Sequence, residues 1–259
     1  MRYPALSISL IFFTLIYPLS VPANSTSPQG SLVLEKKTVI LIRSGRIARQ
    51  QPHRKKAIVS FPVVKGGVTD PVVLSRIRSL LLVKNIFETS IEEYRQDTWL
   101  SEFDYKVNYN KNFILDITFR QEGAGAYPDS SEKHLAINLK TGRLITVSDV
   151  FLDNSLSSLA AMIDKKLQAE MRETVDRVNQ DSSIDAEEKS SVPELYKDLK
   201  FEVTHLNDFM ISEDGITFLY DAGFPHVIQA YQPVGQYKFT YAELSTYLKR
   251  QGAPRSLVQ

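Results

Sequence analysis

The chain has 259 residues, of which 43% are hydrophobic and 24% charged, and its formal net charge is +1. This length and composition allow a hydrophobic core without covalent cross-links, and the near-zero charge argues against a general nucleic-acid binder. The chain contains no cysteine. Disulfides, thiolate metal sites, cysteine nucleophiles and anchoring through a lipidated cysteine are therefore excluded.

Residues 1–23 predict a secretory signal peptide. Arg2 supplies a positive start, the run from Leu6 to Ile16 is nearly apolar, and Val21-Pro22-Ala23 offers a small-residue cleavage site. An uncleaved N-terminal anchor is the alternative, but the run is shorter than the roughly 20 residues that span a bilayer, and Pro18 ends it. We expect an exported protein, periplasmic or secreted and from a bacterium, with no transmembrane span in the mature chain.

Residues 24–56 are expected to form a linker followed by basic strands. Residues 38–42 and 57–61 predict two strands with a turn at Ser44-Gly45 between them. Lysines and arginines crowd this stretch, whereas Glu35 is its single acid. They would form either a patch for anionic lipid or wall polymer or a solvated hairpin whose edge is guarded by charge. We favour the hairpin, because the arginines form no compact cluster.

Residues 57–250 predict one α+β domain, followed by a tail at residues 251–259. Apolar residues at helical spacing indicate one amphipathic helix from Pro71 to about Arg95, capped by Asp70. A hairpin of two alternating strands follows. Each strand should place four side chains on one face, Phe103, Tyr105, Val107 and Tyr109 in the first and Phe113, Leu115, Ile117 and Phe119 in the second. Strands at 134–139 and 144–146 extend the meander.

The remainder predicts a second long helix, capped at Asn154, then a mobile acidic loop at 181–191 and a short helix at 193–199. Asp214-Gly215 between apolar runs is typical of a hairpin. A last strand at 236–240 leads into a closing helix, for which Thr240 and Glu243 form a capping box. The fold class is therefore α+β, with an antiparallel meander packed by two long helices and a C-terminal hairpin, strand and closing helix.

No motif for catalysis or metal binding is present. The chain lacks a nucleophile elbow, a P-loop and H-E-x-x-H, and no two of its histidines have a zinc-ligand spacing. We expect no metal and no cofactor. A glycosidase needs two carboxylates about 5–9.5 Å apart in a cleft, a geometry that sequence does not reveal, so a carboxylate-dependent hydrolase stays an alternative.

The long loop between Phe218 and Tyr237 is rich in aromatic residues and contains two prolines. Stiff, tyrosine-rich loops suit recognition of proteins or glycans, because their rings offer contact area at low entropy cost. The same rings would also serve to pack the edge of the core. Together with a tyrosine from the glycine-rich loop at 123–128, the candidate ligand-binding residues are Tyr127, Phe224, His226 and Tyr231.

Several segments resemble the RsiV-like extracytoplasmic domain of unknown function, found in lysozyme-sensing anti-sigma factors and before the catalytic domain of some peptidoglycan deacetylases. They are residues 103–110, 113–117, 138–151, 211–218 and 228–235. The resemblance covers roughly residues 58–249. It implies an α+β fold, an exported setting, no assigned catalytic activity and a role in recognising wall-active proteins.

The chain departs from that family at two positions. Tyr127 stands where a histidine is common, and Ala230 stands where a proline is usual, so lysozyme recognition is not carried over. We expect an exported, non-catalytic binding module that engages an envelope protein or glycan. The alternatives are an exported carboxylate-dependent hydrolase acting on cell-wall material, and a structural envelope protein whose rings are all core.

Overall fold

The computed structural model describes residues 30–50, 52–125 and 127–251. The predicted signal segment and most of the predicted tail lie outside these ranges. In the described ranges, no helix combines the length and the apolar character needed to cross a membrane.

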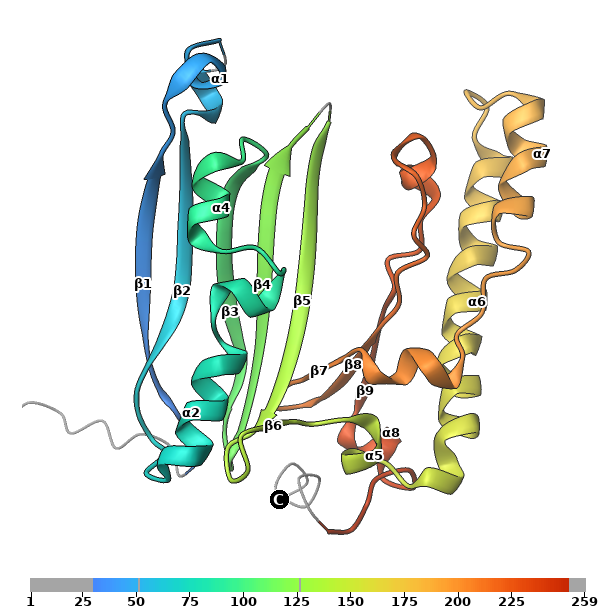
Figure 1. The fold of residues 1–259 in the computed structure, drawn as a ribbon. Coiled ribbons are helices and arrows are strands. Elements are labelled where there is room, and N and C mark those ends of the chain that lie inside the picture. Colours follow the sequence, from blue (N-terminus) through green and yellow to red (C-terminus); the bar gives the residue numbers. More distant parts are fainter. Residues whose placement is uncertain (1–29, 51, 126, 252–259) are drawn as a thin grey trace, which may run out of the picture.

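A six-stranded sheet with strand order β1-β2-β3-β4-β5-β6 forms the first region of the molecule (Figure 1). Neighbouring strands are antiparallel except β2 and β3, which are parallel. The strands are β1 Val33–Ile42, β2 Lys56–Gly66, β3 Leu100–Lys111, β4 Ile114–Ala124, β5 Pro128–Asn138 and β6 Arg143–Leu144. β1 pairs with β2 along its whole length, so part of the stretch at 24–56 belongs to this sheet.

A buried arginine ties the end of β1 to its neighbours. Between β1 and β2 lie α1 (Gly45–Gln50) and a 3₁₀ turn, η1 (Pro52–Arg54). Arg43, just before α1, donates from Nη1 to the carbonyl of Arg54 (2.9 Å) and from Nη2 to the carbonyls of Tyr94 (3.1 Å) and Leu100 (2.7 Å). Burial lowers the pKa of its guanidinium. The prediction of a wholly solvated basic hairpin is thus wrong for Arg43, which has a structural role.

Three short helices cover one face of this sheet, α2 (Pro71–Leu80), α3 (Val83–Ile86) and α4 (Ile91–Gln96) (Figure 1). Asp70 caps α2 as predicted, accepting from the backbone N–H groups of the next turn. The predicted single helix to Arg95 is nevertheless wrong, because Leu82 takes an extended conformation after α2. Ser90 then starts α4 with a capping box that includes Glu93, an S-x-x-E signal readable in the sequence.

A β-bulge changes the predicted faces of the first hairpin. Val107 pairs with Ile117, but Tyr109 pairs with Asp116, so Asn108 is an extra residue in β3. Tyr109 therefore turns to the opposite face from Phe103 and joins a different core cluster. The predicted face of the second strand is confirmed, since its four apolar side chains all pack in the core beneath α2–α4.

The second region contains a three-stranded antiparallel sheet, and this sheet lies between β5 and the long helix α6 (Figure 1). Its strands are β7 Phe209–Ile211, β8 Gly215–Leu219 and β9 Gln236–Thr240; its helices are α5 Val147–Val150, α6 Leu156–Gln180, α7 Ala186–Leu195 and α8 Tyr241–Leu244; and its 3₁₀ turns are η2 Asp153–Ser155, η3 Val203–Asn207 and η4 His226–Tyr231. The α+β class is thus confirmed.

Helix α6 presents the predicted apolar stripe to the core, with Leu159, Ile163 and Leu167 fully buried. The mobile loop predicted at 181–191 is wrong in its second half, which belongs to α7. The Asp185 side chain accepts the N–H of Glu188 at 2.8 Å and caps this helix. The acidic residues after Asp185 therefore lie in the first turn of a helix, where negative charge is favourable.

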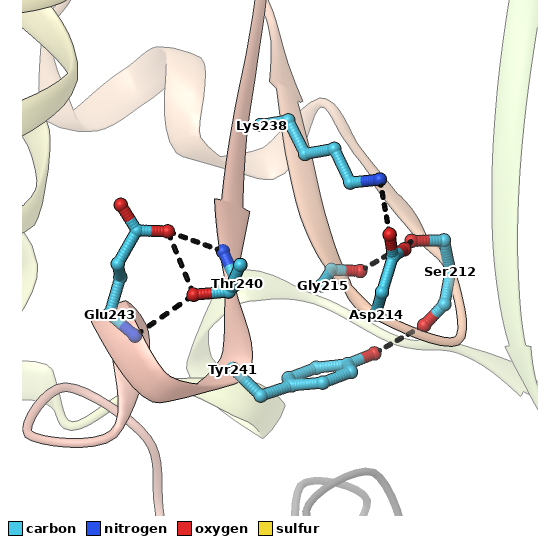
Figure 2. A network of polar contacts seen from close by, with 7 residues as sticks. All are labelled: Ser212, Asp214, Gly215, Lys238, Thr240, Tyr241 and Glu243. Atoms are coloured by element: carbon cyan, nitrogen blue, oxygen red, sulfur yellow. Dashed lines mark hydrogen bonds and ion pairs between the residues drawn. The ribbon is translucent and has the colours of Figure 1, made fainter.

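The C-terminal hairpin and closing helix are held by a polar network (Figure 2). In the β7–β8 turn, Asp214 accepts from the Ser212 hydroxyl and pairs with Lys238 of β9, both at 2.7 Å. The Tyr241 hydroxyl donates to the Ser212 carbonyl at 2.6 Å. Thr240 and Glu243 form the predicted capping box of α8. α8 itself ends at Leu244, before the predicted Arg250.

A buried carboxylate joins the two regions. Asp116 on β4 is fully inaccessible to solvent and accepts the backbone N–H of Ile211 on β7 and a side-chain N–H of Asn108, both at 2.8 Å. Burial raises the pKa of this carboxyl to about 7, although both hydrogen bonds act in the opposite direction. Asn108, the extra residue of the bulge, thus donates a hydrogen bond to the same carboxyl group that binds the second sheet through Ile211.

Candidate binding hollow between the aromatic loops

The glycine-rich turn between β4 and β5 is fixed by the only tryptophan of the chain. The Trp99 carbonyl accepts the N–H of Ala124 at 2.9 Å. A Cβ added at Gly123 would lie 2.3 Å from that carbonyl oxygen and 2.5 Å from the indole ring, so only glycine allows this close approach. Arg54 also donates to the carbonyl of Gly125 at 2.6 Å. Hydrogen bonds to both Trp99 and Arg54 therefore hold the end of β4.

The aromatic loop of the second region is held by its own side chains. The Phe224 ring stacks on Tyr196 at the end of α7, with centroids 6.1 Å apart and an interplanar angle of 19°. Its backbone N–H donates to Gln232 Oε1 at 3.0 Å. His226 opens the turn η4, and its Nδ1 lies 3.3 Å from Gln229 Oε1.

The two loops meet through one pair of rings. Tyr127 and His226 stack with centroids 4.6 Å apart and an interplanar angle of 25°. Tyr127 is 63% exposed, so this contact leaves most of its side chain accessible to solvent. It links the β4–β5 turn of the first region to η4 of the second.

A hollow of about 360 Å³ lies beside this stacked pair. Its walls come from three segments, namely the residue before β3, the β4–β5 turn with the start of β5, and the aromatic loop. They combine ring faces with a carboxylate, an amide and an imidazole, and the lining residues are Trp99, Gly125, Tyr127, Pro128, Asp129, Phe224, His226 and Gln229. The arrangement offers flat apolar contacts and hydrogen-bonding groups within one small volume.

The structure brings together three of the four residues that were predicted to bind a ligand, Tyr127, Phe224 and His226. It places Tyr231 elsewhere. The Tyr231 hydroxyl donates to Glu188 on α7, its carbonyl accepts the Tyr196 hydroxyl at 2.6 Å, and its ring packs at the margin of the core. The hydrogen bond to Glu188 raises the pKa of this phenol, since it favours the protonated form. Tyr231 therefore anchors the aromatic loop to α7.

Sequence reasoning missed three residues of the hollow, Trp99, Asp129 and Gln229. Trp99 had a readable signal, because a lone tryptophan directly before a strand that pairs with a glycine-rich segment is a candidate for close ring-to-backbone packing. No sequence signal marks Asp129 or Gln229. Each is an ordinary polar residue that lines the hollow only because the two loops come together in the folded chain. Across the ranges that the structure describes, no three His, Asp or Glu side chains gather in a way that would hold a metal ion.

No protein-family model and no curated protein sequence matches this chain. Among solved structures, it is similar to a member of the DUF3298 family from Bacteroides fragilis NCTC 9343. That comparison has a TM-score of 0.56 and 16% identity, and covers 86% of this chain and 96% of the other.

A DUF3298 family protein from Pseudomonas aeruginosa PAO1 is similar as well. Its TM-score is 0.50 and its identity 13%, with 85% of this chain and 96% of the other covered. At such identities the likeness extends to the fold alone. The chain thus has the α+β fold of structures from an uncharacterised domain family, while the RsiV-like resemblance stays a prediction.

Proposed function

We propose that this protein is an exported binding module that holds a glycan of the cell envelope in the hollow between the aromatic loops, without chemical conversion. One observation carries the proposal, namely that side chains from both regions converge there as ring faces beside polar groups. The face of an aromatic ring carries partial negative charge. It can therefore accept the C–H groups on the flat side of a sugar ring, while Asp129 and Gln229 supply acceptors and donors for hydroxyls.

The proposed setting follows from the first 23 residues. Their positive start, apolar run and small-residue site are typical of a secretory signal peptide. A protein exported on this signal would meet envelope polymers. An exposed ring pair beside a hollow suits such ligands, because rings that are already ordered lose little conformational freedom on binding.

The hydrolase alternative has less support at this site. Hydrolysis of a glycosidic bond uses two carboxyl groups flanking the bond, and the lining of the hollow contains one, Asp129. The carboxyl with a pKa of about 7, Asp116, is fully buried at the junction of the two sheets. We therefore assign Asp129 to hydrogen bonding with the ligand.

The test is calorimetric titration of residues 24–259 with short oligosaccharides of N-acetylglucosamine and with soluble peptidoglycan fragments. Tyr127→Ala is expected to weaken glycan binding at least tenfold, because it removes one wall and the partner of His226, whereas Tyr127→Phe should retain most of the affinity. Val227→Ala is the matched control, since Val227 is 87% exposed on the same turn as His226 and does not line the hollow.

Three results would contradict the proposal. The first is the absence of saturable glycan binding, and the second is equal affinities for Tyr127→Ala and Val227→Ala. The third is the appearance of shortened oligosaccharides in mass spectra after incubation with the protein, which would favour the hydrolase. If the protein binds no glycan but binds an envelope protein, and Tyr127→Ala abolishes that binding, then the same surface would serve to recognise a protein.

A further inference from the structure

An apolar groove lies beside β2, far in sequence from the aromatic loops. Within the residues that the structure describes, β2 and β3 pair at two positions, Ile58 with Glu102 and Val59 with Phe103. Pro62, which has no N–H to donate, lies in the part of β2 beyond these pairs. A hollow of about 500 Å³ extends between this part of β2, the junction of α2 with α3, and the start of α4.

The walls of this groove are mostly aliphatic and aromatic. They include Phe61 and Val64 from β2, Leu81 and Leu82 from the helix junction, and Ile91 from α4. The break between α2 and α3 exposes Leu82, whose accessible fraction is 47%. The break thus places an apolar side chain on the wall of the groove.

Two cations border the apolar walls. Arg78, on the last turn of α2, reaches toward β2 and contacts the Val64 carbonyl at 3.4 Å, and Lys84 lies on α3. Neither forms an ion pair with any carboxylate in the described ranges. The acid of the lining, Glu92, is paired with Arg95 at 3.1 Å. The groove thus combines an apolar interior with uncompensated positive charge.

We propose that this groove binds a single-chain anionic amphiphile, a long-chain fatty acid. The acyl chain would occupy the apolar walls, and the carboxylate would lie near Arg78 and Lys84. The volume falls within the roughly 300–1,000 Å³ of small-molecule sites, and each methylene of an acyl chain that is buried against apolar walls favours binding. The groove shares no residue with the aromatic hollow, so either proposal can fail without the other.

The first experiment titrates residues 24–259 with oleate below its critical micelle concentration, following displacement of a fluorescent fatty acid. Saturable binding at one site is expected. Leu82→Asp should weaken it at least tenfold, because a charge would then lie on the apolar wall. Val72→Asp is the matched control, since Val72 is an exposed valine of α2 outside the lining, and its affinity should stay within twofold of the parent. Circular dichroism of both variants verifies that they fold.

The second experiment tests the anionic head. The double variant Arg78→Gln/Lys84→Gln should weaken oleate binding about fivefold to tenfold, and Lys106→Gln on β3 should not change it. Oleyl alcohol, with the same chain and no charge, should bind more weakly than oleate. The proposal is overturned by absence of saturable binding, by equal losses in Leu82→Asp and Val72→Asp, or by oleyl alcohol binding as tightly as oleate.

Discussion

The two regions of the molecule bury their cores by different means. In the first, apolar side chains from long strands pack beneath three short helices, which cover one face of a six-stranded sheet. In the second, a three-stranded sheet is too small to form a core alone, and the 25-residue helix α6 supplies a continuous apolar stripe. The second core also includes Tyr109, Ile114 and Ala136 from the first sheet. The second region therefore depends on the first more than the first depends on it.

The candidate site lies at the junction between the two regions. The hollow lies in neither region alone but where the β4–β5 turn meets the loop before β9. Each region holds its own loop, through Trp99 on one side and through the stacking of Phe224 on Tyr196 on the other. The distance between the loops is thus set by the packing of the two sheets.

The largest expected effect tests whether the regions unfold as one. Phe218, fully buried in β8, contacts four other phenylalanine rings with centroids 5.7–6.5 Å away. Phe218→Ala should cost about 3–5 kcal/mol of stability. Urea unfolding followed by the fluorescence of Trp99, which lies in the first region, should report this full loss. A Trp99 transition that stays at its parent midpoint would show that the regions unfold separately.

The junction between the regions should make stability depend on pH. The Asp116 carboxyl ordinarily titrates near 3.8 and is raised to about 7 in the folded state, so the folded state binds more protons in this window. The contribution of this group to stability is therefore largest below pH 4. It falls as the pH rises toward 7, by about 4 kcal/mol at most.

Urea unfolding at a series of pH values measures this dependence. Asp116→Asn should flatten the slope between pH 4 and 7, although an amide has one acceptor oxygen, so either Ile211 or Asn108 would lose its acceptor. Asp176→Asn, which changes an exposed carboxylate on α6, serves as the control and should keep the parental slope. A parental slope in Asp116→Asn would contradict the assignment.

The smallest effects compare matching caps in the two regions. Ser90 with Glu93 in the first region and Thr240 with Glu243 in the second form the same capping box. Ser90→Ala and Thr240→Ala should each cost about 1 kcal/mol, as measured by the midpoint of thermal unfolding. Thr240 also joins the end of β9 to α8 and belongs to the network shown in Figure 2. A loss at Thr240 much below that at Ser90 would show that α8 contributes little to the second core.

Local patterns in the sequence determined many of the elements, because each depends on neighbours a few positions away. The Asp70 cap, the apolar stripe of α6, the Asp214-Gly215 hairpin and the Thr240 capping box all depend on such spacing. The aromatic loop and the glycine-rich loop together predict four candidate residues, and three of them line one hollow.

Tertiary structure alone decided three other features. The bulge at Asn108 turns Tyr109 toward the second sheet, and strict alternation cannot indicate an extra residue. Arg43 is buried and donates to three carbonyls, of which those of Tyr94 and Leu100 come from segments far away in sequence. Tyr231 lies outside the hollow because hydrogen bonds with Tyr196 and Glu188 hold it against α7. Each feature depends on at least one contact between distant segments, such as Ile211 with Asp116, Leu100 with Arg43 and Tyr196 with Tyr231. Such contacts form only when the elements pack together.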